Sequence, residues 1–191
     1  MDNKDIRICA LSPDLLSDFL SFFDNDAFAD NPRWASCYCQ FLYVDHRCVD
    51  WGSRTLDDNR TAACDRIRAG SMDGYLAYRE EEPVGWCNAA PRTMMAAFDD
   101  EPDPDAARMG QIGCFVVAKA HRRSGVATAL LHAACDGLRA RGLQIVEATP
   151  VAEPGNDAEA HLGTLGMYLG AGFRIFKTRD DGVVQVRRRL T

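Results

Sequence analysis

The sequence lacks a long hydrophobic run, a secretion signal, internal repeats and low-complexity tracts. None of its apolar stretches approaches the roughly 18 residues that a membrane-spanning helix needs. The segment that follows Met1 is polar, whereas a signal peptide would carry an apolar core there. We therefore expect a cytoplasmic protein with no membrane partner. Its 191 residues are enough for one sizeable hydrophobic core.

The chain has fewer basic than acidic residues, 22 against 28, and its formal net charge is -6. Nucleic acids and anionic membranes attract proteins chiefly through clustered cations. The charge balance therefore predicts no nucleic-acid partner. The basic run at 187–189 is short, and we interpret it as a solvated strand end.

Disulfides are not expected, although the chain has eight cysteines. Several of them lie inside apolar patterns, such as Cys114 in Gly-Cys-Phe-Val-Val and Cys135 in Leu-Leu-His-Ala-Ala-Cys. In a reducing compartment such cysteines usually pack as small hydrophobic side chains.

Strands and helices alternate along the whole chain, which predicts one mixed α/β domain. A Ser-Pro pair at 12–13 begins a helix, and Gly70 and Gly142 each end one. Turn signals at 80–83 and 180–182 indicate β-hairpins. The expected strands are 5–10, 75–79, 84–90, 111–118, 143–149, 173–178 and 183–188, and the expected helices are 13–23, 55–69, 126–141 and 160–171.

Residues 112–142 carry the most informative pattern, in which a hydrophobic strand runs through a short Arg/Gly loop directly into a helix. The first N–H groups of a helix lack internal partners, and that end of the helix carries partial positive charge. Gly125 lets the backbone approach a ligand, Ala127 keeps the next turn small, and Arg122 and Arg123 add charge for phosphate oxygens. The loop is neither a Walker A motif nor a G-x-G-x-x-G motif. Taken alone, it predicts either a phosphate site or an ordinary turn with two surface arginines.

The run Arg122-Arg123-Ser124-Gly125-Val126-Ala127 resembles the Arg/Gln-x-x-Gly-x-Gly/Ala signature of the GNAT superfamily of acyl-CoA-dependent N-acetyltransferases. A second family feature also matches, because Tyr168 lies four residues before the Gly172-Phe173 pair. The two motifs stand in the family's order, and the resemblance covers roughly residues 74–190. It implies a mostly antiparallel twisted sheet of about seven strands flanked by about four helices, in a single domain over residues 1–191.

The resemblance implies acetyl-CoA as co-substrate and assigns roles by position. Backbone N–H groups of residues 123–127 would hold the CoA pyrophosphate. Main-chain groups of residues 115–117 would pair with the pantetheine arm, and an N–H on that strand would polarise the thioester carbonyl. Tyr168, with a pKa of about 10, would hydrogen-bond to the departing thiolate, whose thiol form has a pKa of about 8.5, and protonate it. The residues implied for the cofactor are Phe115, Val116, Val117, Arg122, Arg123, Ser124, Gly125, Val126, Ala127 and His161.

Two catalytic assignments stay open. Many family members carry Asn seven residues before the tyrosine, where this chain has His161; it would contact the cofactor, take a proton or simply begin a helix. A general base must deprotonate the acceptor amine, whose pKa is about 10.4 if it is lysine-like. Glu147, His121 and, through a water, Asn88 are the candidates. A cysteine nucleophile is not implied, because family members react by direct transfer in a ternary complex.

Three variable regions are expected to surround the acceptor: residues 24–53, 99–105 and 178–183. The first is rich in aromatics such as Trp34 and Trp51, which would embrace an amine or cover the core. The acidic loop 99–105 would attract a cationic substrate or simply be solvated.

Two other functions remain as alternatives. Cys37, Cys39, His46 and Cys48 could bind zinc or form a redox centre, although the one-residue gap makes tetrahedral closure awkward. A GNAT-like fold without catalysis would be an acyl-CoA-binding sensor. The favoured interpretation is an N-acetyltransferase that acts on a primary amine of a small molecule or peptide, with no metal. Homodimers are frequent among relatives, which makes a homodimer possible by analogy, but the sequence does not fix the oligomeric state.

Overall fold

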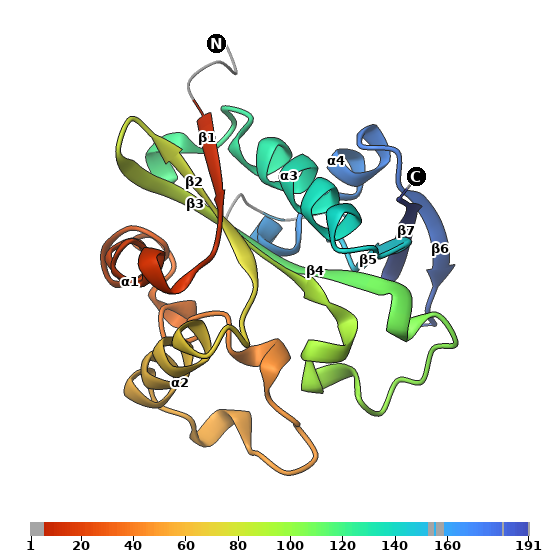
Figure 1. The fold of residues 1–191 in the computed structure, drawn as a ribbon, viewed down its shortest axis with the longest axis horizontal. Coiled ribbons are helices and arrows are strands. Elements are labelled where there is room, and N and C mark those ends of the chain that lie inside the picture. Colours follow the sequence, from red (N-terminus) through yellow and green to blue (C-terminus); the bar gives the residue numbers. More distant parts are fainter. Residues whose placement is uncertain (1–5, 153–154, 156–158, 181, 191) are drawn as a thin grey trace.

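The computed structural model describes residues 6–152, 155, 159–180 and 182–190. Within these ranges seven strands form one sheet in the order β1-β2-β3-β4-β5-β7-β6 (Figure 1). Only the β4–β5 pair is parallel among the described strands, and the other pairs are antiparallel. The mixed, mostly antiparallel sheet is therefore confirmed. The strands are β1 (Ile6–Ala10), β2 (Gly74–Arg79), β3 (Glu82–Pro91), β4 (Met109–Val117), β5 (Ile145–Ala148), β6 (Arg174–Thr178) and β7 (Val184–Arg189).

The helices α1 (Leu16–Asn25) and α2 (Leu56–Arg68) cover one face of the sheet, and α3 (Val126–Ala140) and α4 (Leu165–Gly170) cover the other (Figure 1). The alternation of β3 side chains shows this division, because successive residues of a strand point to opposite faces. Cys87 and Ala89 belong to the core under α3. Trp86 and Ala90 belong to the core under α1 and α2. Each face therefore has a hydrophobic core of its own.

Local signals explain where the helices begin and end. A 3₁₀ turn, Pro13–Leu15, leads into α1, as expected from the proline. Thr55 and Asp58 form a capping box at the start of α2. Gly142 adopts the left-handed conformation after α3, with φ of 83°.

The segment expected as one helix over 160–171 is instead two pieces. A 3₁₀ helix, Glu159–Leu162, is separated from α4 by Gly163, whose φ of 77° cannot continue a right-handed helix. Thr164 then caps α4 by accepting from the Met167 N–H. The predicted turn at 180–182 contains Asp181, and the first predicted strand begins at Asp5; both lie outside the described residues.

The β4–β5 junction shapes the centre of the sheet. The parallel ladder ends where Ile112 pairs with Ala148, so the second half of β4 extends past the last β5 pair. On its other edge β4 contains a bulge, because Asn88 pairs with Cys114 and Ala89 with Ile112. Gly113 is therefore the extra residue in this ladder.

Along the described ranges, no helix has both the length and the apolar character to cross a membrane.

Candidate active site

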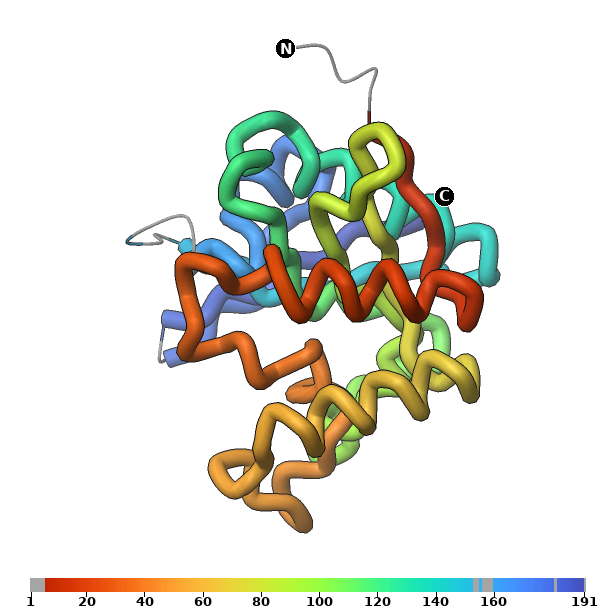
Figure 2. The backbone as a smooth tube through the Cα atoms, turned by 90° about the vertical axis from the view of Figure 1, so that its left-hand side faces the viewer, coloured from red at the N-terminus to blue at the C-terminus, as the bar shows by residue number. Residues whose placement is uncertain are grey.

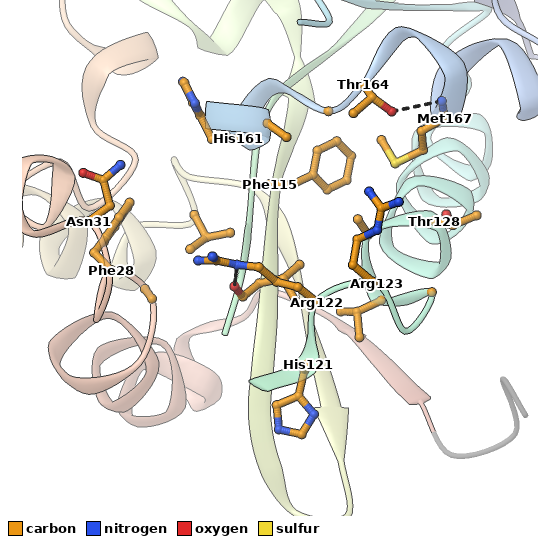
Figure 3. Close-up of a pocket in the computed structure, with 18 of the residues that line it drawn as sticks. Phe28, Asn31, Phe115, His121, Arg122, Arg123, Thr128, His161, Thr164 and Met167 are labelled. Atoms are coloured by element: carbon orange, nitrogen blue, oxygen red, sulfur yellow. Dashed lines mark hydrogen bonds between the residues drawn. The ribbon is translucent and has the colours of Figure 1, made fainter. Parts of the chain in front are cut away.

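A cavity of about 310 Å³ opens beside the second half of β4. Its walls come from the end of β4, the loop that enters α3, the chain around the start of α4 and the chain that follows α1 (Figure 3). Hollows of this size or larger are typical of small-molecule sites. Of the cofactor-binding residues predicted from the sequence, only Ser124 is missing from the described lining. The cavity is lined by Ala27, Phe28, Asn31, Trp34, Phe115, Val116, Val117, His121, Arg122, Arg123, Gly125, Val126, Ala127, Thr128, Ala160, His161, Gly163, Thr164 and Met167.

The loop that enters α3 lines the cavity with Arg123 and Gly125. Arg123 and Gly125 both have positive φ values, 59° and 87°, which turn the chain sharply into the helix. Ala129 donates its N–H to the Gly125 carbonyl, so helix geometry leaves the N–H groups of residues 125–128 without intrahelical acceptors. A helix start preceded by left-handed residues is an anion-binding arrangement.

Ser124 supports this loop from within. Its hydroxyl donates to the His121 carbonyl over 2.6 Å and accepts from Arg79 Nη2 over 3.2 Å. Arg79 lies on β2, so the bond ties the loop to the sheet. No sequence signal could predict this contact, because the two residues are far apart in the chain.

The Arg122 guanidinium is held by Asp30. The two Nη atoms donate to the two carboxylate oxygens over 2.6 and 2.7 Å, and Nε donates to the Val117 carbonyl over 3.1 Å. Hydrogen bonding to Arg122 lowers the pKa of Asp30. A contact of this guanidinium with phosphate stays a prediction, since Asp30 occupies its fork in this structure.

Tyr168 is fully buried on α4. Its ring packs edge-on against Phe173 at 5.0 Å and Phe115 at 6.3 Å between centroids. The hydroxyl donates to the Leu162 carbonyl over 3.1 Å. Burial raises the pKa of Tyr168 well above its usual value, so the phenol is protonated at neutral pH and is a weaker acid than a solvent-exposed tyrosine. Tyr168 is not among the described lining residues of the cavity, whereas its neighbours Gly163 and Met167 are.

His161 lines the cavity and packs against Trp34, a residue that the sequence did not link to the cofactor. The imidazole and indole centroids lie 4.2 Å apart. Both rings belong to the cavity wall. Spacing along the chain could not pair them, because they lie far apart in the sequence.

Glu147 lies in a buried charge network, away from the cavity lining described above. One carboxylate oxygen accepts from Arg92 Nη1 over 3.0 Å, and the other accepts from Arg187 Nε over 2.6 Å. Arg187 also binds Asp103, so part of the acidic loop is fixed against the sheet rather than merely solvated. Arg92 further donates to Gln111 over 3.1 Å. Both oxygens of Glu147 are thus engaged, and its role as a base stays a prediction.

The other candidate bases lie apart from one another. His121 lines the cavity at the entrance to the α3 loop. Asn88 is buried on the α1/α2 face, where it accepts from the Tyr43 hydroxyl and donates to the Cys39 carbonyl.

The cysteine and histidine cluster at 37–48 does not converge. Cys39 contacts Cys114 with 2.8 Å between sulfurs, His46 packs against Phe41, and Cys48 contacts Asp45. Over the described ranges no three Cys, His, Asp or Glu side chains gather as a metal site would require.

Comparison with known proteins agrees with this geometry. The family model for the acetyltransferase (GNAT) family matches residues 33–167. The chain belongs to the GNAT acetyltransferase family. Members of this family use acetyl-CoA as the acetyl donor. Curated proteins give no match to the chain.

Solved GNAT structures share the fold at low sequence identity. A GCN5-related N-acetyltransferase from Kribbella flavida has a TM-score of 0.61 and 17% identity, with 99% of this chain and 100% of that chain covered. The ribosomal-protein-alanine N-acetyltransferase from Brucella melitensis has a TM-score of 0.56 and 20% identity, covering 96% and 99%. The yncA protein of Salmonella typhimurium, solved with its cofactor acetyl-CoA, has a TM-score of 0.56 and 14% identity, covering 98% and 95%. At these identities the likeness shows the fold, and the family itself is shown by the family model.

Proposed function

We propose that this protein transfers the acetyl group of acetyl-CoA to a primary amine of a small molecule or peptide. We call residues 122–125 the cradle loop and the backbone N–H groups of residues 125–128 the N–H cradle. One observation carries the proposal: the same cavity joins this cradle, at the start of α3, to the half of β4 that extends past β5. The cradle suits a pyrophosphate. An extended β4 segment beyond its last β5 partner suits an extended pantetheine arm, which can hydrogen-bond to main-chain groups as an added strand would.

The residues present fit the two ends of this ligand. Gly125 leaves the cradle open because its left-handed backbone carries no side chain. Phe115 and Val116 are buried and Val117 is half-buried, so the arm would lie against an apolar strand. Gly113, the bulge residue, precedes them on β4, and we assign the N–H that polarises the thioester carbonyl to this part of the strand.

The chemistry follows from these placements. The acceptor nitrogen attacks the carbonyl carbon directly in the ternary complex, and the C–S bond then breaks. The departing thiolate takes its proton from the Tyr168 hydroxyl, which would exchange the Leu162 carbonyl for the sulfur. We assign proton uptake from the amine to His161, His121 or a water, because Glu147 uses both oxygens in ion pairs.

We define the acceptor by its chemical class, a primary amine of a small molecule or peptide. The aromatic segment 24–53 and the acidic loop 99–105 border the face of the sheet on which α1 and α2 lie, and we propose that they select the amine. We expect no nucleic-acid or membrane partner, a cytoplasmic location and, by analogy with relatives, a homodimer.

Calorimetric titration of acetyl-CoA tests the proposal. The wild type should bind, and Gly125→Glu should not, because a carboxylate in the cradle would repel the pyrophosphate. Gly142→Glu is the matched control, since Gly142 also has positive φ and lies at the opposite end of α3; it should bind as the wild type does. Failure of the wild type to bind would refute the proposed function. Binding without thiol release across a panel of amines would favour the acyl-CoA sensor instead.

A further inference from the structure

The outer wall of the cavity comes from the chain that follows α1. In Figure 2 this chain leaves α1, turns down and runs back beneath the helix before it reaches α2. Ala27, Phe28, Asn31 and Trp34 contribute to the lining. Figure 3 shows Phe28 and Asn31 on the side of the opening opposite Thr164 and Met167. We call residues 26–34 the outer wall.

The outer wall is anchored at two points. Asp30 binds Arg122 of the cradle loop through a bidentate pair whose side chains are only 22% and 17% exposed. A bidentate arginine–carboxylate pair that is largely shielded from solvent holds its geometry better than an exposed one. Trp34 packs against His161 at the other side of the cavity. The wall therefore spans from the cradle loop to the chain before α4.

We infer that Trp34 is a cofactor-binding residue whose indole packs against the pantetheine arm of acetyl-CoA. The inference rests on the proposed function, because it places a new contact in the same cavity. The phosphate groups have their own site in the N–H cradle. The wall beyond it offers aromatic and apolar surface through Trp34 and Phe28, opposite the buried β4 residue Phe115. Such a surface suits the uncharged arm and contributes little to a phosphate.

Tryptophan emission gives a direct readout of this contact. Acetyl-CoA should change the emission of the wild type in a saturable way, with a midpoint that matches the calorimetric Kd. Trp34→Phe should abolish most of the change. Trp51→Phe is the matched control, because Trp51, like Trp34, packs against a histidine but is not part of the cavity lining in the described chain. It should keep the response.

A truncated ligand separates the arm from the phosphates. Trp34→Ala should weaken acetyl-CoA binding about tenfold, which corresponds to about 1.4 kcal/mol, the size expected for one aromatic contact. The same variant should bind adenosine 3′-phosphate 5′-diphosphate, which keeps the pyrophosphate but lacks the pantetheine arm, as tightly as the wild type does. Equal losses for both ligands would mean that the cavity as a whole is damaged, and would overturn the inference.

Two further outcomes are distinguishable. If the wild type binds acetyl-CoA in the calorimeter but Trp34→Phe keeps the full emission change, Trp34 does not contact the arm and the inference is wrong while the proposed function stands. If the wild type does not bind at all, the proposed function and the inference fall together.

Discussion

Gly163→Ala provides the sharpest test of how the cavity is built. Gly163 has φ of 77° and separates the 3₁₀ helix from α4. A Cβ placed there would lie 2.7 Å from Met167 Cε, 2.7 Å from Tyr168 Cε2 and 3.3 Å from Phe115 Cε2. Real Cβ atoms do not approach so closely, so the substitution must displace side chains that line or border the cavity.

The expected cost has two parts. A left-handed backbone costs a non-glycine residue about 1–2 kcal/mol. Overpacking against Met167 and the Tyr168 ring adds about 1–3 kcal/mol. Gly142→Ala isolates the first part, because Gly142 has φ of 83° and a Cβ added there would meet nothing within 4 Å. We therefore expect Gly163→Ala to lower the free energy of unfolding by about 2–5 kcal/mol and Gly142→Ala by about 1–2 kcal/mol.

Urea unfolding and calorimetry should be combined on the two variants. Both should lose stability, but only Gly163→Ala should lose affinity for acetyl-CoA, because only its neighbours line the cavity. Equal losses of stability together with unchanged affinity in both variants would refute the packing that the structure shows around residue 163.

Three further predictions concern protons and charges. Tyr168→Phe should cut kcat while leaving acetyl-CoA affinity nearly intact. It should also cost about 1 kcal/mol of stability, because the hydrogen bond to the Leu162 carbonyl is lost. An unchanged kcat in steady-state kinetics would remove the assignment of Tyr168 as the acid. Glu147→Gln should lower stability by about 3 kcal/mol in urea unfolding, because Arg92 and Arg187 would lose the buried carboxylate that they share and keep only Glu101 and Asp103 as acidic partners. A lost activity with unchanged stability would instead indicate a base. Burial in the folded protein raises the pKa of all five tyrosines. Above pH 10 the tyrosine hydroxyls of the unfolded chain therefore lose their protons before those of the folded chain do. The free energy of unfolding should therefore fall as pH rises from 10 to about 12, and a folded protein whose tyrosinate absorbance already appears at pH 10 would contradict this.

The parts of the fold that sequence could predict are those with local causes. The proline at 13 and the glycine at 142 act within a few positions of their own. The cradle loop was predictable for the same reason, since the strand, the glycine and the helix follow one another directly. The prediction of a single helix at 160–171 was wrong because Gly163 breaks it, a signal that the apolar spacing around it obscures.

The parts that sequence could not predict depend on contacts between distant positions. Asp30 and Arg122 are 92 residues apart, and Glu147 and Arg92 are 55 apart. Each is an ordinary charged residue in its local context. Only the folded chain shows that the first pair holds the wall of the cavity and that the second is buried beneath the acidic loop.

The chain between α1 and α2 borders both the cofactor cavity and β4 at Gly113. It begins in the outer wall with Asp30 and Trp34 and continues to Leu42, which lies so close to Gly113 that a Cβ there would overlap it. Gly113 is the bulge residue of β4, at the point where the proposed thioester would meet the amine. Because the same stretch borders the cavity and Gly113, we expect a substitution at Leu42 to alter acceptor selection, and titration with acetyl-CoA would measure whether the contacts of Asp30 and Trp34 change with it.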